Sequence, residues 1–262
     1  MKKFVAFILA AFLLVSCAKK IETTSENAPP KKPGYHLKFP SDFKVGMNSV
    51  DDFGISVAII MDVSGSMSNA PKGGEDKKYI QANNALKTVT NFLIQIAEKQ
   101  KDLKIQVSIL RFSSGVELVL PLTVLNSEGI SKLKASTNIK FFEPDGGTAI
   151  GEAVEKGASI LAQSGTILNS LIVISDGENT GSLTPDVALD ALYDNRNTAS
   201  TADYEVRTSS QMVSFVGFDV SSGIFDNVKK KGARVASATN QAELEQSLTS
   251  LLEADITKLE SK

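Results

Sequence analysis

The chain has 262 residues, of which 42% are hydrophobic and 22% charged, and its formal net charge at pH 7 is -2. This length suffices for one large domain or two small ones with a well-buried core. A nearly neutral chain without a Lys/Arg stripe gives no indication of a nucleic-acid partner, because such proteins are usually basic. Glycine-rich phosphate loops are absent from the sequence. The only histidine, His36, lies in a proline-rich segment, which argues against a histidine-based triad or a zinc site.

The first residues have the features of an export signal. Two lysines precede an apolar run, 4–15, which is too short to span a bilayer as a stable helix but matches the core of a signal peptide. It ends in "LLVSC" (13–17), which resembles the lipobox of bacterial lipoproteins. That resemblance implies a lipoprotein signal peptide over 1–16 and a lipid anchor to a membrane on Cys17, the only cysteine. An ordinary signal peptide with an incidental cysteine is the alternative.

The resemblance also implies a place for the protein. It would be an exported bacterial lipoprotein of the cell envelope, and an outer-membrane or cell-surface position is favoured because no retention signal of the enteric type follows the cysteine. Residues 17–50 contain four of the eight prolines among Lys, Ser, Thr, Glu and Asn. Such a composition cannot bury enough apolar surface to offset the entropy of ordering it. We therefore predict a lipidated, flexible tether over 17–50 and a folded domain over 51–262.

From residue 54 onward, strand patterns alternate with helix patterns. Nearly unbroken apolar runs, typical of strands covered on both faces, occur at 55–61, 104–112, 169–175, 211–218 and 233–238. The segment 115–123 is predicted as a hairpin partner at an edge, where Pro121 is tolerated.

The helix patterns are apolar stripes at helical spacing. One stripe is Ala82, Leu86, Val89, Leu93 and Ile96, and another is Leu244, Leu248, Leu252, Ile256 and Leu259. A third helix is predicted over 149–163 with Thr148 as its N-cap, and Asn240 is predicted to start the last helix. The alternation predicts an α/β fold with a doubly wound, mostly parallel, open sheet, in which ligands bind beyond the carboxyl ends of the strands.

Three loops predicted at that edge carry oxygen-bearing side chains. Asp62, Ser64 and Ser66 follow the first strand, Thr148 precedes a helix, and Asp176 follows a buried strand. Each feature alone is typical of a turn or a cap. Together they supply two carboxylates and three hydroxyls, a set that suits a hard divalent cation such as Mg²⁺ or Mn²⁺.

These residues resemble the metal-ion-dependent adhesion site of the von Willebrand factor type A domain, a motif of Asp-x-Ser-x-Ser followed by a separate Thr and a separate Asp. The wording "DVSGSM", "GGTAIGEA" and "ISDGEN" is similar to that family, and the resemblance covers roughly residues 54–258. It implies a Rossmann-like sheet of about six strands with one antiparallel edge strand. It also implies a Mg²⁺ (or Mn²⁺) site that captures an acidic side chain of a protein ligand.

Two other functions are compatible with parts of this pattern. A phosphoryl-transfer enzyme of the haloacid dehalogenase type also places an Asp after the first strand, but it needs a second Asp two positions later, where Ser64 stands. We therefore expect no enzymatic activity. A scaffold of envelope biogenesis that binds a neighbouring membrane protein is the remaining alternative.

The composition of three further segments predicts exposed loops. The segments 68–79 and 178–186 are predicted to rim the metal site, the first as an exposed and mobile loop, with Thr184 and Pro185 starting a helix. The polar run 194–210 is predicted at the opposite end of the sheet.

Overall fold

The apolar runs form one six-stranded sheet in the computed structural model, which describes residues 52–74, 76–194, 211–221 and 223–260. The sheet order is β3-β2-β1-β4-β5-β6. The strands are β1 (Asp52–Asp62), β2 (Lys104–Phe112), β3 (Val116–Val124), β4 (Thr166–Ser175), β5 (Gln211–Phe218) and β6 (Arg234–Ala238). The predicted signal peptide, Cys17 and the tether lie outside the described residues, as does nearly all of the polar run 194–210.

All neighbouring strands are parallel except β2 and β3, which pair antiparallel. β3 lies at one edge of the sheet and contains Pro121, where a missing N–H costs no ladder hydrogen bond. The predicted fold class is therefore confirmed: a mostly parallel open sheet with one antiparallel edge strand.

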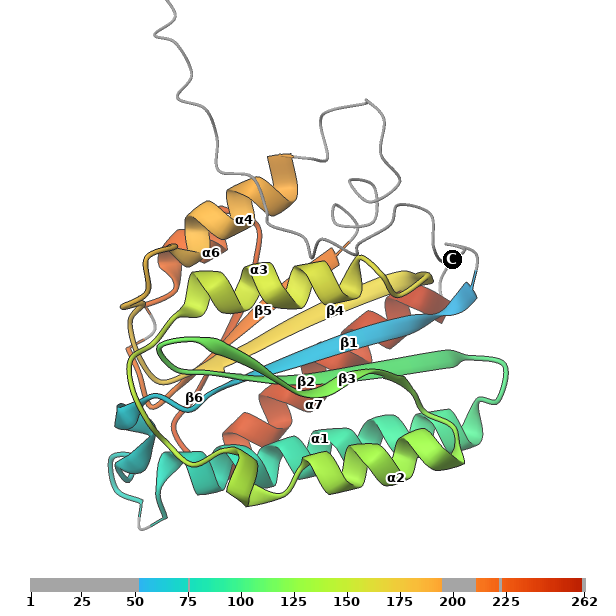
Figure 1. The fold of residues 1–262 in the computed structure, drawn as a ribbon, viewed down its shortest axis with the longest axis horizontal. Helices are drawn as coiled ribbons and strands as arrows, with labels where there is room; N and C mark the ends of the chain where they lie inside the picture. The colour runs from blue at the N-terminus through green and yellow to red at the C-terminus, as the bar shows by residue number, and fades with distance from the viewer. Residues whose placement is uncertain (1–51, 75, 195–210, 222, 261–262) are drawn as a thin grey trace, which may run out of the picture. The chain divides into compact units, whose positions relative to one another are not determined.

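Helices cover both faces of this sheet (Figure 1). One face carries α1 (Lys78–Lys99), α2 (Ser127–Ser136) and α7 (Gln241–Glu260). The other carries α3 (Ile150–Leu161), α4 (Pro185–Asp194) and α6 (Asp226–Lys230). Two short 3₁₀ helices, η1 (Gly65–Ser68) and η2 (Ile139–Phe141), lie in the connections. The doubly wound arrangement predicted from the alternation is confirmed.

Burial on both faces explains why β1 is almost entirely apolar from Ile55 to Met61. Ile59 and Met61 belong to the core under α1 and α7, whereas Ala58 and Ile60 belong to the core under α3 and α4. Both faces of the strand are thus buried, which removes the alternation that a half-exposed strand would show.

Two helices, α4 and α7, begin where the sequence predicts. Asn240 accepts a hydrogen bond from the backbone N–H of Glu243 at 3.0 Å, as expected for the predicted start of α7. α4 begins at the predicted Pro185. α2 was not predicted, although Asn126 caps it by accepting from Gly129 N at 2.8 Å.

The sheet brings the ends of β1 and β4 together. The chain leaves β1 toward β2 and β3 on one side and later adds β4, β5 and β6 on the other, so strand order reverses between β1 and β4. Their carboxyl ends lie at the left of Figure 1, beside η1. Loops at such a reversal point leave a crevice beyond the strand ends. Within the described ranges, no helix is both long and apolar enough to cross a membrane.

Candidate metal centre

Asp62 is the last residue of β1, and its side chain is fully buried. Its Oδ1 accepts from Ser64 N at 2.7 Å and its Oδ2 accepts from Ser175 Oγ at 2.5 Å. Burial, the largest effect, raises the pKa of Asp62 from 3.8 to about 6, while these hydrogen bonds partly offset it and the Asp176 carboxylate raises it further. Among the described residues no Lys, Arg or His forms an ion pair with Asp62.

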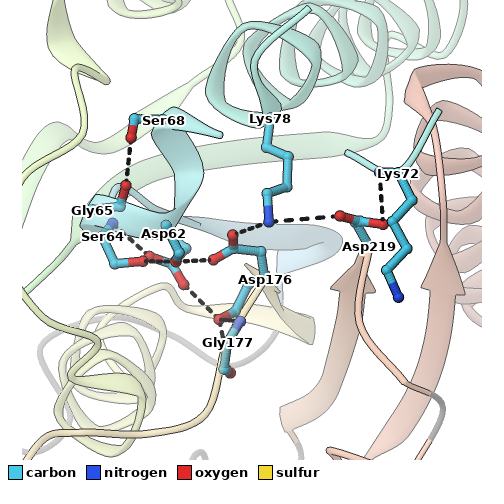
Figure 2. Close-up of polar contacts among 11 residues, drawn as sticks. Asp62, Ser64, Gly65, Ser68, Lys72, Lys78, Asp176, Gly177 and Asp219 are labelled. Atoms are coloured by element: carbon cyan, nitrogen blue, oxygen red, sulfur yellow. Dashed lines mark hydrogen bonds and ion pairs between the residues drawn. The ribbon is translucent and has the colours of Figure 1, made fainter. Parts of the chain in front are cut away.

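Ser64 and Ser66 connect Asp62 to Asp176. Their hydroxyl oxygens are 3.1 Å apart, and Ser66 Oγ donates to Asp176 Oδ1 at 2.7 Å. The loop is tied to the segment before Thr148, because Gly65 N donates to Gly146 O at 3.1 Å. Figure 2 shows Asp62, Ser64 and Asp176 converging at the end of the sheet. Four of the five predicted residues therefore form one hydrogen-bonded chain.

The Thr148 hydroxyl lies at the same edge of the sheet, beside Gly177. A Cβ atom added to Gly177 would lie 4.0 Å from Ser66 Oγ and 4.0 Å from Thr148 Oγ1, so both hydroxyls border the same glycine. The main chain of Thr148 is held by Thr180, whose Oγ1 accepts from Thr148 N and whose N donates to Thr148 O, each at 2.8 Å. No hydrogen bond within the described residues involves the Thr148 hydroxyl.

The prediction that Thr148 caps α3 is wrong. α3 begins at Ile150, and Asn179 from the loop after β4 accepts from Ile150 N at 2.8 Å and Gly151 N at 3.4 Å. The Thr148 side chain is therefore not used for capping, since a residue far along the chain supplies the cap. Its hydroxyl is available for other contacts at this edge.

The loop after β4 is fastened to α3 by a second contact. Glu152 Oε1 accepts from Ser182 N, Ser182 Oγ and Leu183 N at 2.9, 2.9 and 3.0 Å. Burial raises the pKa of Glu152, but these bonds outweigh that effect and hold it below its ordinary range. Glu152 thus acts as a charged anchor for the predicted rim segment 178–186.

Asp176 differs from Asp62 in having a cationic partner. Its carboxylate is fully buried, and Oδ2 lies 2.6 Å from Lys78 Nζ. Lys78 Nζ also lies 3.7 Å from Asp219 Oδ2, at the end of β5. The prediction that 68–79 is an exposed loop is wrong for Lys78 and for Pro71, which are buried.

Sequence reasoning missed Ser175, Lys78 and Asn179 as members of this region. Ser175 could have been suspected because it directly precedes Asp176 at a strand end. Lys78 stands in a charged run that is typical of an exposed loop, and Asn179 has no local signal.

The oxygen atoms of this region fit a hard divalent cation. They are carboxylates and hydroxyls on three loops, and the buried Asp62 carboxylate has only neutral hydrogen-bond donors. Across the described parts of the chain no cluster of three or more Asp, Glu, His or Cys side chains occurs. A cation bound here would therefore depend on hydroxyl oxygens and few charged ligands, a combination compatible with Mg²⁺ or Mn²⁺.

Comparisons with known proteins agree with the fold. The family model of the von Willebrand factor type A domain matches residues 57–178. No curated protein matches the sequence. The six-stranded, mostly parallel α/β fold of this chain is of the von Willebrand factor type A kind, and the family model matches its part from β1 to the loop after β4.

Three solved structures illustrate the similarity. The PilB minor pilin from Streptococcus sanguinis is 15% identical, with a TM-score of 0.58 over 77% of this chain and 61% of that chain. BatB, a conserved hypothetical protein from Bacteroides thetaiotaomicron, is 18% identical, with a TM-score of 0.56 over 80% and 100%. The vWF domain of the type V pili tip protein Mfa5 from Porphyromonas gingivalis is 11% identical, with a TM-score of 0.53 over 77% and 96%. This chain therefore spans less than two thirds of PilB, and identities this low show the fold alone.

Proposed function

We propose that this chain is a membrane-anchored, metal-dependent protein-binding module of the adhesion type. Its divalent cation, Mg²⁺ or Mn²⁺, would be held at the carboxyl edge of the sheet and would capture a carboxylate of a partner protein. The observation that carries the proposal is the hydrogen-bonded chain from Asp62 through Ser64 and Ser66 to Asp176, with the Thr148 hydroxyl beside the same glycine.

The residues of this chain have distinct parts in the proposal. Asp62, Ser64, Ser66, Thr148 and Asp176 would hold the cation, while Ser175 keeps the Asp62 carboxylate oriented through its 2.5 Å hydrogen bond. When bound, the cation would supply positive charge and a coordination position for the carboxylate of the partner. Asp62 is costly to keep ionised in this buried position without a nearby positive charge. A divalent cation would remove that cost, which is the physical reason for expecting one.

The similar solved structures support the protein-binding class. They include a minor pilin and a pilus tip protein. An envelope scaffold would use the same cation site on a neighbouring membrane protein, so the two functions differ in the partner and not in the chemistry. We propose no enzymatic activity, because Ser64 stands where a phosphoryl-transfer enzyme would need its general acid.

Thermal unfolding with and without metal tests the site. A cation that binds only the folded state adds about 2.7 kcal/mol at a hundredfold excess over its dissociation constant. For a domain of this size, that raises the melting temperature by roughly 5–10 °C. Mg²⁺ or Mn²⁺ should cause this rise in the wild type relative to EDTA, and Ser66→Ala should reduce it.

Ser68→Ala is the matched control for Ser66→Ala. Ser68 belongs to the same short helix, but it is exposed and donates to Gly65 O at 2.7 Å (Figure 2). Its variant should respond to metal as the wild type does. Equal metal responses of Ser66→Ala and wild type would place the cation elsewhere.

Partner capture tests the rest of the proposal. The purified wild-type domain should retain an envelope protein in Mg²⁺ and lose it in EDTA, whereas Ser66→Ala should retain less and Ser68→Ala the same amount. Retention that is equal in Mg²⁺ and EDTA would contradict metal-dependent capture. A phosphatase assay on the same preparation tests the enzymatic alternative.

A further inference from the structure

Lys78 is a buried lysine at the first position of α1, next to the proposed metal centre. Its side chain is 9% exposed, and its ammonium group lies 2.6 Å from Asp176 Oδ2 and 3.7 Å from Asp219 Oδ2. Figure 2 shows the ammonium between the two carboxylates, which come from the ends of β4 and β5. Burying an ammonium group is expensive unless negative charges lie close to it. Its position therefore depends on these two aspartates.

Asp176 divides its two oxygen atoms between different partners. Oδ1 accepts from Ser66 Oγ, in the proposed metal centre, whereas Oδ2 faces Lys78. Asp62, the other carboxylate of the centre, has only neutral donors. The positive charge of Lys78 thus compensates one of the two proposed carboxylate ligands and leaves the other uncompensated.

Asp219 is held in a position to share that positive charge. Its backbone N–H donates to Ala238 O at 2.7 Å, and its Oδ1 accepts from Lys72 N at 3.3 Å. Its φ angle of 56° is in the left-handed region, which few residues other than Gly, Asn and Asp adopt readily. Because its negative charge lies close to Lys78 Nζ, Asp219 partly cancels the positive potential that Lys78 produces at the Asp176 carboxylate.

We propose, resting on the metal-binding function proposed above, that Lys78 sets the affinity of the centre for its divalent cation. The tethered ammonium neutralises Asp176 and repels a second positive charge, so a cation binds more weakly than the oxygen ligands alone would allow. Asp219 opposes this effect by attracting Lys78. A cation that the chain alone holds weakly gains more binding free energy from the carboxylate of a partner. Metal occupancy therefore becomes coupled to partner binding.

Two substitutions separate this role from a purely structural ion pair. Lys78→Met keeps the length of the side chain and removes its charge, so the dissociation constant for Mn²⁺ should fall. A charge this close shifts a proton equilibrium by about 1–3 pK units, so the fall should be about tenfold or more. Asp219→Asn keeps the size and tolerates the backbone angle, and it leaves Lys78 to Asp176 alone, so the constant should rise severalfold. A structural ion pair would lower stability in both variants without moving Mn²⁺ affinity in opposite directions.

The measurement is isothermal titration of the wild type and both variants with Mn²⁺ at pH 8, after removal of metal with EDTA. Lys72→Met is the control, because it removes a lysine charge from the same region at an exposed residue, and its constant should stay within about twofold of the wild type. Lys78→Gln replaces Lys78→Met if the latter does not fold, and the opposite effect of Asp219→Asn is expected in either case.

The outcomes separate this inference from the proposed function. Metal binding by the wild type with an unchanged constant in the Lys78 variant overturns the role of Lys78 and leaves the metal centre standing. Binding by the Lys78 variant alone supports that role and overturns the proposal that the wild-type chain uses a metal. Absence of binding in every form overturns both.

Discussion

Replacing Asp62 by asparagine should stabilise the metal-free protein at neutral pH, and the gain should disappear in acid. Asp62 is fully buried and accepts hydrogen bonds from Ser64 and Ser175, but it forms no ion pair within the described part of the chain. Asparagine has nearly the same shape and no charge. Its oxygen can keep the bond from Ser64 N, and the Ser175 hydroxyl can turn to accept from its amide group.

The sign of the pH dependence follows from the pKa. Burial raises the pKa of Asp62 from 3.8 to about 6, so the folded protein holds this proton more tightly than the unfolded chain does. Its favourable contribution to wild-type stability is complete below pH 3.8 and is lost as the pH rises through about 6. The pKa difference corresponds to roughly 3 kcal/mol. For a domain of this size that is roughly 6–12 °C in melting temperature.

The assay is thermal unfolding in EDTA between pH 4.5 and 8, followed by circular dichroism. The melting temperature of Asp62→Asn minus that of the wild type should increase with pH and level off above about pH 7. Asp145→Asn is the control, since Asp145 is an exposed carboxylate on the same edge, and its difference should vary little. Saturating Mg²⁺ at pH 8 should reverse the order of wild type and Asp62→Asn. A difference that does not change with pH would refute the reasoning from burial.

Three further predictions concern Thr148, Asn179 and Cys17. Thr148→Ala should keep a metal-dependent rise in melting temperature, because it removes one proposed ligand and no helix cap. It should bind a captured partner about tenfold more weakly, a loss of about 1.4 kcal/mol that titration calorimetry measures. Unchanged partner affinity would contradict this prediction. Asn179→Ala should lower metal-free stability by about 1 kcal/mol in urea denaturation, because it removes the cap of α3, and Asn179→Asp, which keeps an acceptor, should lose less. Cys17→Ser should abolish labelling by a palmitate analogue, because the hydroxyl does not replace the thiol, and persistent labelling would exclude Cys17 as the lipidated residue.

The strands and their burial on both faces could be predicted because the sequence signals for them are local. Residues such as Ile59 and Ile60 are apolar in succession since helices cover both faces of β1, and this leaves an unbroken run in the sequence. The stripe from Leu244 to Leu259 likewise records one buried face of α7. A parallel sheet then requires the ends of β1 and β4 to lie at one edge, which is why Asp62 and Asp176 could be predicted at the same edge, whereas the adjacency of the two strands is seen in the structure.

The partners of those residues were decided only by the tertiary structure. Thr148 had the local features of a helix cap, but Asn179 reaches α3 from another loop and takes that role. Lys78 stands in a charged run whose composition is typical of an exposed loop, yet the start of α1 brings it against Asp176. A hydrogen bond or ion pair between residues far apart in the chain leaves no periodic pattern in the sequence. The oxygen ligands could therefore be predicted from local sequence, whereas the charge that surrounds them depends on how the strand ends and helix starts pack together.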